Sequence, residues 1–231
     1  TGQFSKTTPA LAISSNGILH LVFVANNNGN GLLYTSSQDN GATWGDIPYT
    51  GQDSKIAPAL TVGKNGTLHL VFVANNNGNG LMYMSSQDNG TTWGDVPYTG
   101  QDSKIAPALT IGKNGTLYLA FVASDGSNQI CIISSQDGIH WSSKQETGQS
   151  SLFAPALAVL NNTLYLAFVS SDGSNQICII SSQDSIHWSS EQETGQSSLF
   201  APALAVLNNT LYLAFVSSDG SNQICIISSY K

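Results

Sequence analysis

The chain has 231 residues, of which 41% are hydrophobic and only 9% are charged, well below the quarter that is usual in soluble domains. All seven basic residues are lysines, and the formal net charge is -7. Such a scarcity of cations excludes nucleic acid and anionic lipid as partners, because both must be neutralised by clustered basic residues. The apolar runs are too short for membrane insertion, and recurring β-branched and aromatic residues exclude disorder.

One unit is copied five times along the chain. The tripeptide Thr-Gly-Gln opens each copy, which gives repeats 1–49, 50–98, 99–146, 147–193 and 194–231. The segment Gln145–Ser182 is identical to Gln192–Ser229, which indicates recent duplication or engineering. Because the repeats share one pattern from end to end, they predict a single repeat domain.

Within a repeat the hydrophobic period is two, which predicts short strands. In the first repeat these lie around Pro9–Ile13, Ile18–Ala25, Leu32–Ser36 and Thr43–Ile47, and Asn16-Gly17 fits a tight turn with two positive φ angles. The second strand is apolar on both faces, so sheets must pack on either side of it. The prediction is an all-β propeller of about five blades with four antiparallel strands each. The last blade lacks its outer strand, and neither chain end supplies one.

An acidic turn before the fourth predicted strand carries a motif. Ser37–Trp44 and Ser86–Trp93 both have the form S-x-D-x-G-x-T-W, and Ser135–Trp141 and Ser182–Trp188 are one residue shorter. This resembles the Asp-box, or BNR, repeat of sialidase-like β-propellers. The resemblance implies a folding element on the face opposite the ligand site, in which the carboxylate accepts bonds from backbone N–H groups. We therefore expect structural roles for Asp39, Trp44, Asp88, Trp93, Asp137, Trp141, Asp184 and Trp188.

The same resemblance raises the question of catalysis. Sialidases hold the substrate carboxylate with three arginines, and this chain has none. A glycosidase needs two carboxylates in different environments, whereas acids such as Asp53 and Asp102 recur as equivalent copies. His20 and His69 align with tyrosines of the later repeats, which predicts packing roles. The expectation is a protein that is not an enzyme, with no catalytic residue, cofactor or metal.

The loops on the other face are rich in amides and hydroxyls, which pair with sugar hydroxyls. They resemble the loops of propeller lectins, which implies one sugar site per blade or between blades. The expected function is a multivalent lectin for neutral mono- or oligosaccharides on glycoconjugates. The expected ligand-binding residues are Asn26, Asn27, Asn28, Asn30, Gln52, Asp53, Asn75, Asn76, Asn77, Asn79, Gln101, Asp102, Asp125, Ser127, Asn128, Gln129, Asp172, Ser174, Asn175, Gln176, Asp219, Ser221, Asn222 and Gln223.

Two alternatives stay open. One is a non-catalytic structural or protein-interaction propeller, built from engineered or recently duplicated repeats; the other, ranked lower, is a glycoside hydrolase that is not a sialidase. We expect a secreted or extracellular location. The last strand, around Gln223–Ser229, has an open edge. It predicts either protection by Lys231 or a homo-oligomer formed through this edge.

Overall fold

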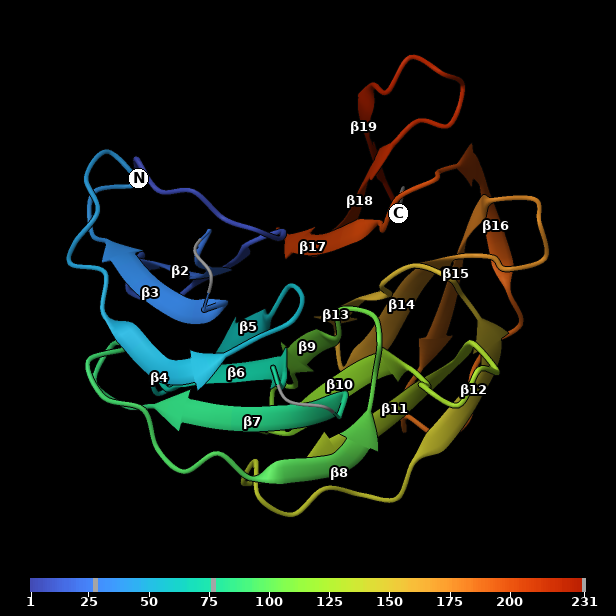
Figure 1. Cartoon of the computed structure of the whole chain (residues 1–231). Helices are drawn as coiled ribbons and strands as arrows, with labels where there is room; N and C mark the ends of the chain where they lie inside the picture. The colour runs from blue at the N-terminus through green and yellow to red at the C-terminus, as the bar shows by residue number, and fades with distance from the viewer. Residues whose placement is uncertain (27–28, 76–77, 230–231) are drawn as a thin grey trace.

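The computed structural model describes residues 1–26, 29–75 and 78–229. In this part of the chain nineteen strands form five antiparallel sheets, which are the blades of a β-propeller (Figure 1). Four sheets have four strands and the last has three, as the sequence predicts. No helix among these residues is long and apolar enough to cross a membrane.

Each blade is built from consecutive strands in chain order. The strands are β1 (Ala10–Ile13), β2 (Leu19–Val24), β3 (Gly31–Ser37) and β4 (Tyr49–Asp53); β5 (Ala59–Val62), β6 (Leu68–Val73), β7 (Gly80–Ser86) and β8 (Tyr98–Asp102); β9 (Ala108–Ile111), β10 (Leu117–Val122), β11 (Gln129–Ser135) and β12 (Gln145–Ser150); β13 (Ala156–Leu160), β14 (Thr163–Val169), β15 (Gln176–Ser182) and β16 (Gln192–Ser197); and β17 (Ala203–Leu207), β18 (Thr210–Val216) and β19 (Ile224–Ser228).

The position predicted for the fourth strand is wrong. The segment Thr43–Ile47 forms no strand, and β4 begins at Tyr49, which pairs with Leu33 of β3. The reason is local, because Gly45 and Pro48 disfavour a strand before β4 whereas Tyr49 and Thr50 favour one. The Thr-Gly-Gln tripeptide that opens a repeat is therefore the outer strand of the preceding blade.

The turn between the first two strands of a blade was expected to have two residues with positive φ, and the first three repeats differ from this. In the first three repeats only the glycine has a positive φ, for example +84° at Gly17. The asparagine before it instead accepts a backbone bond, as Asn65 Oδ1 does from the N–H of Thr67 at 3.2 Å. In the fourth repeat both Asn161 and Asn162 have positive φ, so the expected geometry is found there.

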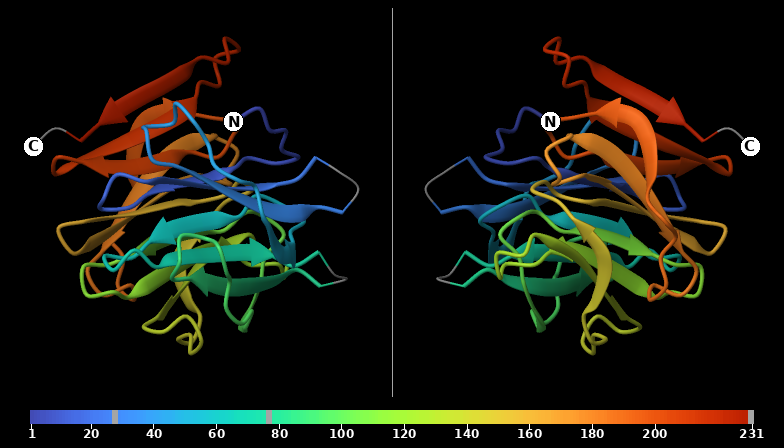
Figure 2. Two further views of the ribbon diagram at one scale, coloured as in Figure 1. Left: turned by 90° about the vertical axis from the view of Figure 1, so that its left-hand side faces the viewer. Right: turned by 90° about the vertical axis from the view of Figure 1, so that its right-hand side faces the viewer.

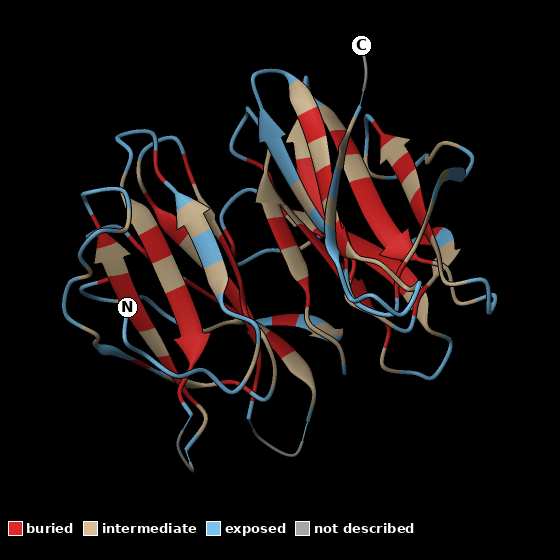
Figure 3. Ribbon diagram, turned by 90° about the horizontal axis from the view of Figure 1, so that it is seen from above, coloured by how far each residue is buried: buried red, intermediate tan, exposed pale blue. Residues whose placement is uncertain are grey.

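The blades pack face to face through their first strands. β1 contacts β5, β5 contacts β9, β9 contacts β13 and β13 contacts β17, and apolar side chains fill the space between blades. β1 and β17 share no comparable contact in the described part of the chain. Side views of the stacked blades are given in Figure 2, and Figure 3 shows the burial of each residue, which is greatest in the second and third strands of the blades. The core is thus divided into layers between consecutive blades.

Candidate functional site

Each Asp-box turn is stabilised by hydrogen bonds from its own residues to its aspartate. The Asp39 carboxylate accepts bonds from the N–H of Thr43 at 2.8 Å and from the Thr43 hydroxyl at 2.6 Å. Ser37 donates its hydroxyl to the same carboxylate at 2.8 Å. These bonds, with that from the Thr43 hydroxyl the largest cause, lower the pKa of Asp39 to about 2. The carboxylate is fully engaged by its own hairpin, as expected for a folding element.

The shorter boxes of the third and fourth repeats use histidine where the longer ones use threonine. His140 lies with Nδ1 2.7 Å from Asp137 Oδ2, and its N–H donates to Asp137 Oδ1 at 2.8 Å. His187 makes the same contacts with Asp184. Their hydrogen bonds to these histidines, first among several, hold the pKa of both aspartates well below the usual range. Both histidines are therefore partners of the box acids.

The box also joins neighbouring blades. Trp141 packs edge-on against Tyr83 of the preceding blade, with ring centroids 5.9 Å apart. The Tyr83 ring lies directly over Gly138, where a Cβ atom would overlap it. The Tyr83 hydroxyl lies 2.7 Å from His69 Nδ1, and burial lowers the pKa of His69 to about 4. The predicted packing role of His69 and the inward-facing box tryptophan are both found here.

The loops expected to bind ligand lie at the opposite end of the strands, because the chain reverses direction at every turn. In the second and fourth blades, hydrogen bonds tie this loop to the segment that enters the blade. Lys55 Nζ donates to the Gly78 carbonyl at 2.7 Å, and the hydroxyls of Ser150 and Ser171 lie 2.6 Å apart. The segment that leaves one blade and the loop of the next therefore form a continuous surface. Asn27, Asn28, Asn76 and Asn77 lie outside the described residues.

Several of the expected ligand-binding residues shape their own loop. Asp125 accepts bonds from the Ser127 N–H at 2.9 Å and hydroxyl at 2.6 Å, and Asn128 has a φ of +57°. The same Asp–Ser pairing is repeated in the fourth and fifth blades, and left-handed asparagines recur at the equivalent positions: Asp172–Ser174, Asp219–Ser221, Asn30, Asn175 and Asn222. These side chains fix the turn, and exposed polar atoms of the loop remain for a ligand.

Two tyrosines form an exposed feature that sequence reasoning missed. The Tyr49 side chain is 55% exposed, its ring covers Gly31, and its hydroxyl donates to Asp53 Oδ1 at 2.9 Å. Partial burial, followed by this bond and the charge of Asp53, raises the pKa of Tyr49. Tyr98 and Asp102 repeat the arrangement at 2.9 Å. The available signal was the segment Pro-Tyr-Thr-Gly-Gln-Asp, which spans the start of the second and third repeats only.

The later blades have a different group at the same place. Where the first two blades have a glycine under a tyrosine ring, the third and fourth have Gln129 and Gln176. The side-chain oxygen of each glutamine is buried and has no hydrogen-bond partner within the described residues. An acceptor of this kind is costly to leave unpaired. The start of the third strand therefore has an unpaired acceptor in the third and fourth blades, and the ligand-binding role expected for Gln129 and Gln176 stays a prediction.

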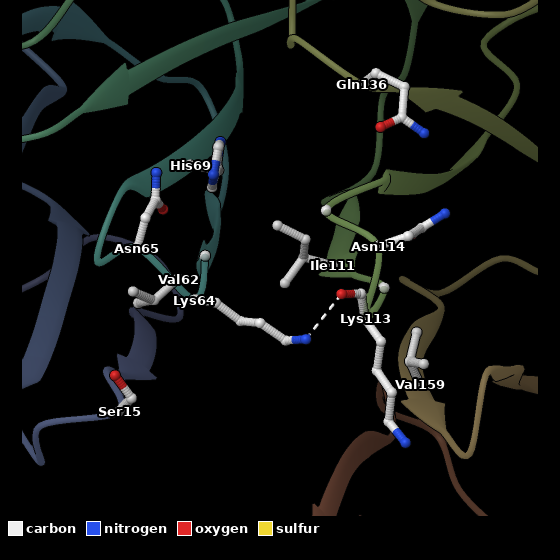
Figure 4. A pocket seen from close by; sticks show the side chains of 13 residues that line it. Ser15, Val62, Lys64, Asn65, His69, Ile111, Lys113, Asn114, Gln136 and Val159 are labelled. Carbon is white, nitrogen blue, oxygen red and sulfur yellow. Dashed lines mark hydrogen bonds between the residues drawn. The ribbon is translucent and has the colours of Figure 1, made fainter.

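A cavity of about 620 Å³ opens on the Asp-box side, between the turns that join the first two strands of successive blades (Figure 4). Lys64 and Asn65 line it from one blade and Lys113 and Asn114 from the next. Lys64 Nζ donates to the Lys113 carbonyl at 2.8 Å across its mouth. None of the residues expected to bind ligand lines this cavity.

The fold and the four box turns define the chain as an Asp-box β-propeller. Residues 50–229 match the model of the BNR repeat-like domain, and the chain belongs to this family. No curated protein sequence matches the chain.

Similar solved structures have the same fold at low identity. A protein of unknown function from Dyadobacter fermentans is 17% identical with a TM-score of 0.78, over 99% of this chain and 79% of that one. An α-L-arabinanase from Penicillium chrysogenum, complexed with arabinobiose, is 18% identical with a TM-score of 0.69, over 95% and 76%. The NanB sialidase of Streptococcus pneumoniae is 12% identical with a TM-score of 0.73, over 99% and 60%.

These comparisons overturn one prediction. The sequence predicted that the protein is not an enzyme. The similar structures, however, are mostly glycoside hydrolases, among them arabinanases and sialidases. The absence of arginine bears only on recognition of a substrate carboxylate. It is no ground for predicting that the chain is not an enzyme.

Proposed function

We propose that the chain binds neutral carbohydrate on the face that carries the polar loops, next to the outer strands β4 and β8. The observation that carries this proposal is the exposed Tyr49 ring with its hydroxyl fixed by Asp53, repeated at Tyr98 and Asp102. An aromatic ring offers the apolar face of a sugar a flat contact, and an adjacent carboxylate accepts bonds from its hydroxyls.

The chemistry of the surface favours a neutral ligand. The chain has 14 acidic and seven basic residues and no arginine, so it lacks the planar guanidinium that pairs with a carboxylate in two places. Lys55 on the loop face is already bonded to Gly78 and Asn79. Several weak sites on one rigid propeller can bind at the same time to a surface that displays many glycans, which makes the overall binding stronger than that of any single site.

The test is titration of the chain with neutral oligosaccharides, among them arabinobiose, beside a sialylated glycan. Replacing both rings, Tyr49→Ala with Tyr98→Ala, should weaken binding about 10-fold or more, which corresponds to about 1.4 kcal/mol. Ile139→Ala is the matched control, because Ile139 is equally exposed but lies in a box turn on the other face. Unchanged affinity of the double variant would refute the proposed site.

Hydrolysis of neutral glycans is the second candidate function. It is supported by the fold, which the chain shares with an arabinanase and with an exo-β-1,3-galactanase from Phanerochaete chrysosporium that was solved with galactose. Release of reducing sugar from arabinan or galactan, abolished by Asp53→Asn or Asp102→Asn, would favour hydrolysis. Saturable binding without release favours binding alone.

A further inference from the structure

The five blades leave one apolar face open at each end of the series. On the first blade Leu11 is 60% exposed, whereas the equivalent Leu60 is 8% exposed. On the last blade Ile224 is 79% exposed, whereas the equivalent Ile130 and Ile177 are fully buried. Exposed apolar surface of this kind is typical of an interaction site. Between consecutive blades, the Leu11 position packs against the preceding blade and the Ile224 position packs against the following blade. The first and last blades therefore each leave one side of this contact open.

The edge of β19 lacks a bond that the third and fourth blades have. In the third blade the Thr147 hydroxyl of β12 donates to the Ile130 carbonyl of β11 at 2.8 Å, and Thr194 does the same to Ile177 at 2.8 Å. The equivalent carbonyl in β19 belongs to Ile224. It has no such threonine beside it in the part of the chain that the structure describes.

The first residues of the chain have the sequence and conformation of an outer strand but no sheet. Gly2 has a φ of +66°, close to the +71° of Gly195 in β16. The Gln3 N–H donates to the Thr1 hydroxyl at 3.3 Å, as the equivalent atoms do in β12. Phe4 is held against the first blade, since its carbonyl accepts from the Asn26 N–H at 3.3 Å. The segment therefore already has the local conformation of an outer strand, and within the described residues no strand pairs with it.

We propose that Thr1–Phe4 of one copy of the chain adds to β19 of a second copy and completes its last blade. Within one chain the last blade keeps three strands, as the sequence predicts, and Thr1–Phe4 matches the outer strand that this blade lacks. The pairs Gln129↔Ser150 and Gln176↔Ser197 place Phe4 of one copy opposite Gln223 of the other. Thr1 then donates its hydroxyl to the Ile224 carbonyl.

A second copy fits the open faces better than closure within one chain. Figure 1 shows the N-terminus and β19 on opposite sides of the opening. Closure in one chain would bring the two open faces together only if the packing between consecutive blades shifted, and close-packed interfaces resist such shifts. A second copy instead continues, without rearrangement, the blade-to-blade contact that the chain already makes four times. The two faces differ, so the association is head-to-tail and can extend beyond two copies. It does not depend on the proposed glycan site.

Sedimentation of the chain, alone and in mixtures, tests the proposal. The unmodified chain should show an apparent mass of at least twice its 24.3 kDa that rises with concentration. Leu11→Lys and Ile224→Lys each damage one face and should be monomeric alone, and each should fold because both side chains are exposed. Mixed one to one, they should form a dimer, since each retains the face that the other has lost.

Control variants separate the proposal from other causes of association. Ile139→Lys changes an equally exposed side chain outside both faces and should leave the mass unchanged. Phe4→Cys with Gln223→Cys should form a disulfide between chains, whereas Phe4→Cys with Gln176→Cys should not. A monomeric unmodified chain, a mixture that stays monomeric, or a disulfide confined to one chain would overturn the proposal.

Discussion

The contact between Tyr83 and Gly138 gives a sharp test of how the Asp-boxes join the blades. Gly138→Ala combines two costs, because Gly138 has a φ of +77° and a Cβ atom there would overlap the Tyr83 ring. An alanine at positive φ costs about 1–2 kcal/mol and overpacking about 1–3 kcal/mol. The expected loss of unfolding free energy is therefore about 2–5 kcal/mol, measured by urea denaturation.

A matched glycine isolates the contribution of the contact. Gly126 has a φ of +91° but no atom within 4 Å of its ideal Cβ position, so Gly126→Ala should cost only the conformational term. The next blade suggests a rescue, because Ile132 replaces the tyrosine and Ser185 replaces the glycine there. Adding Tyr83→Ile should therefore recover part of the loss in Gly138→Ala. Equal costs for the two alanine variants would refute the argument.

Further predictions concern pH and the polar face. Stability should fall as the pH drops from 6.5 towards 4, because His69 is neutral in the folded state with a pKa lowered to about 4; His69→Tyr should reduce this dependence in thermal unfolding scans. Asp88 has a pKa lowered to about 2, so its stabilisation is complete above about 3.8 and is lost towards pH 2; Asp88→Asn should remove that part of the acid transition. Tyr49→Phe should weaken glycan binding less than Tyr49→Ala in calorimetry, because the ring remains and only the bond to Asp53 is lost.

The fold could be predicted from the sequence because the same pattern of strands and turns recurs in each repeat. Period-two patterning placed the first three strands of every blade, and four box turns fixed the family resemblance. The fourth strand was misplaced because its residues are polar and lie across the boundary at Thr50, so hydrophobic periodicity does not detect it. That error also hid the relation between Thr1–Phe4 and the open edge of β19.

The candidate site was predictable only in outline. Loop composition placed polar residues on one face, but it could not show that Asp125 is bonded within its own turn. Tyr49 and Asp53 are neighbours in space because both lie on one short strand around Gly51, whose φ is +86°. Such a pairing depends on backbone geometry, and composition alone does not reveal it.

The most direct test of the proposed function is calorimetric titration of the chain with a neutral and a sialylated oligosaccharide. We predict saturable binding of the neutral sugar that weakens about 10-fold in the Tyr49→Ala, Tyr98→Ala double variant, with no binding of the sialylated one. Binding that is unaffected by both substitutions, or that requires the sialic acid carboxylate, would contradict the account.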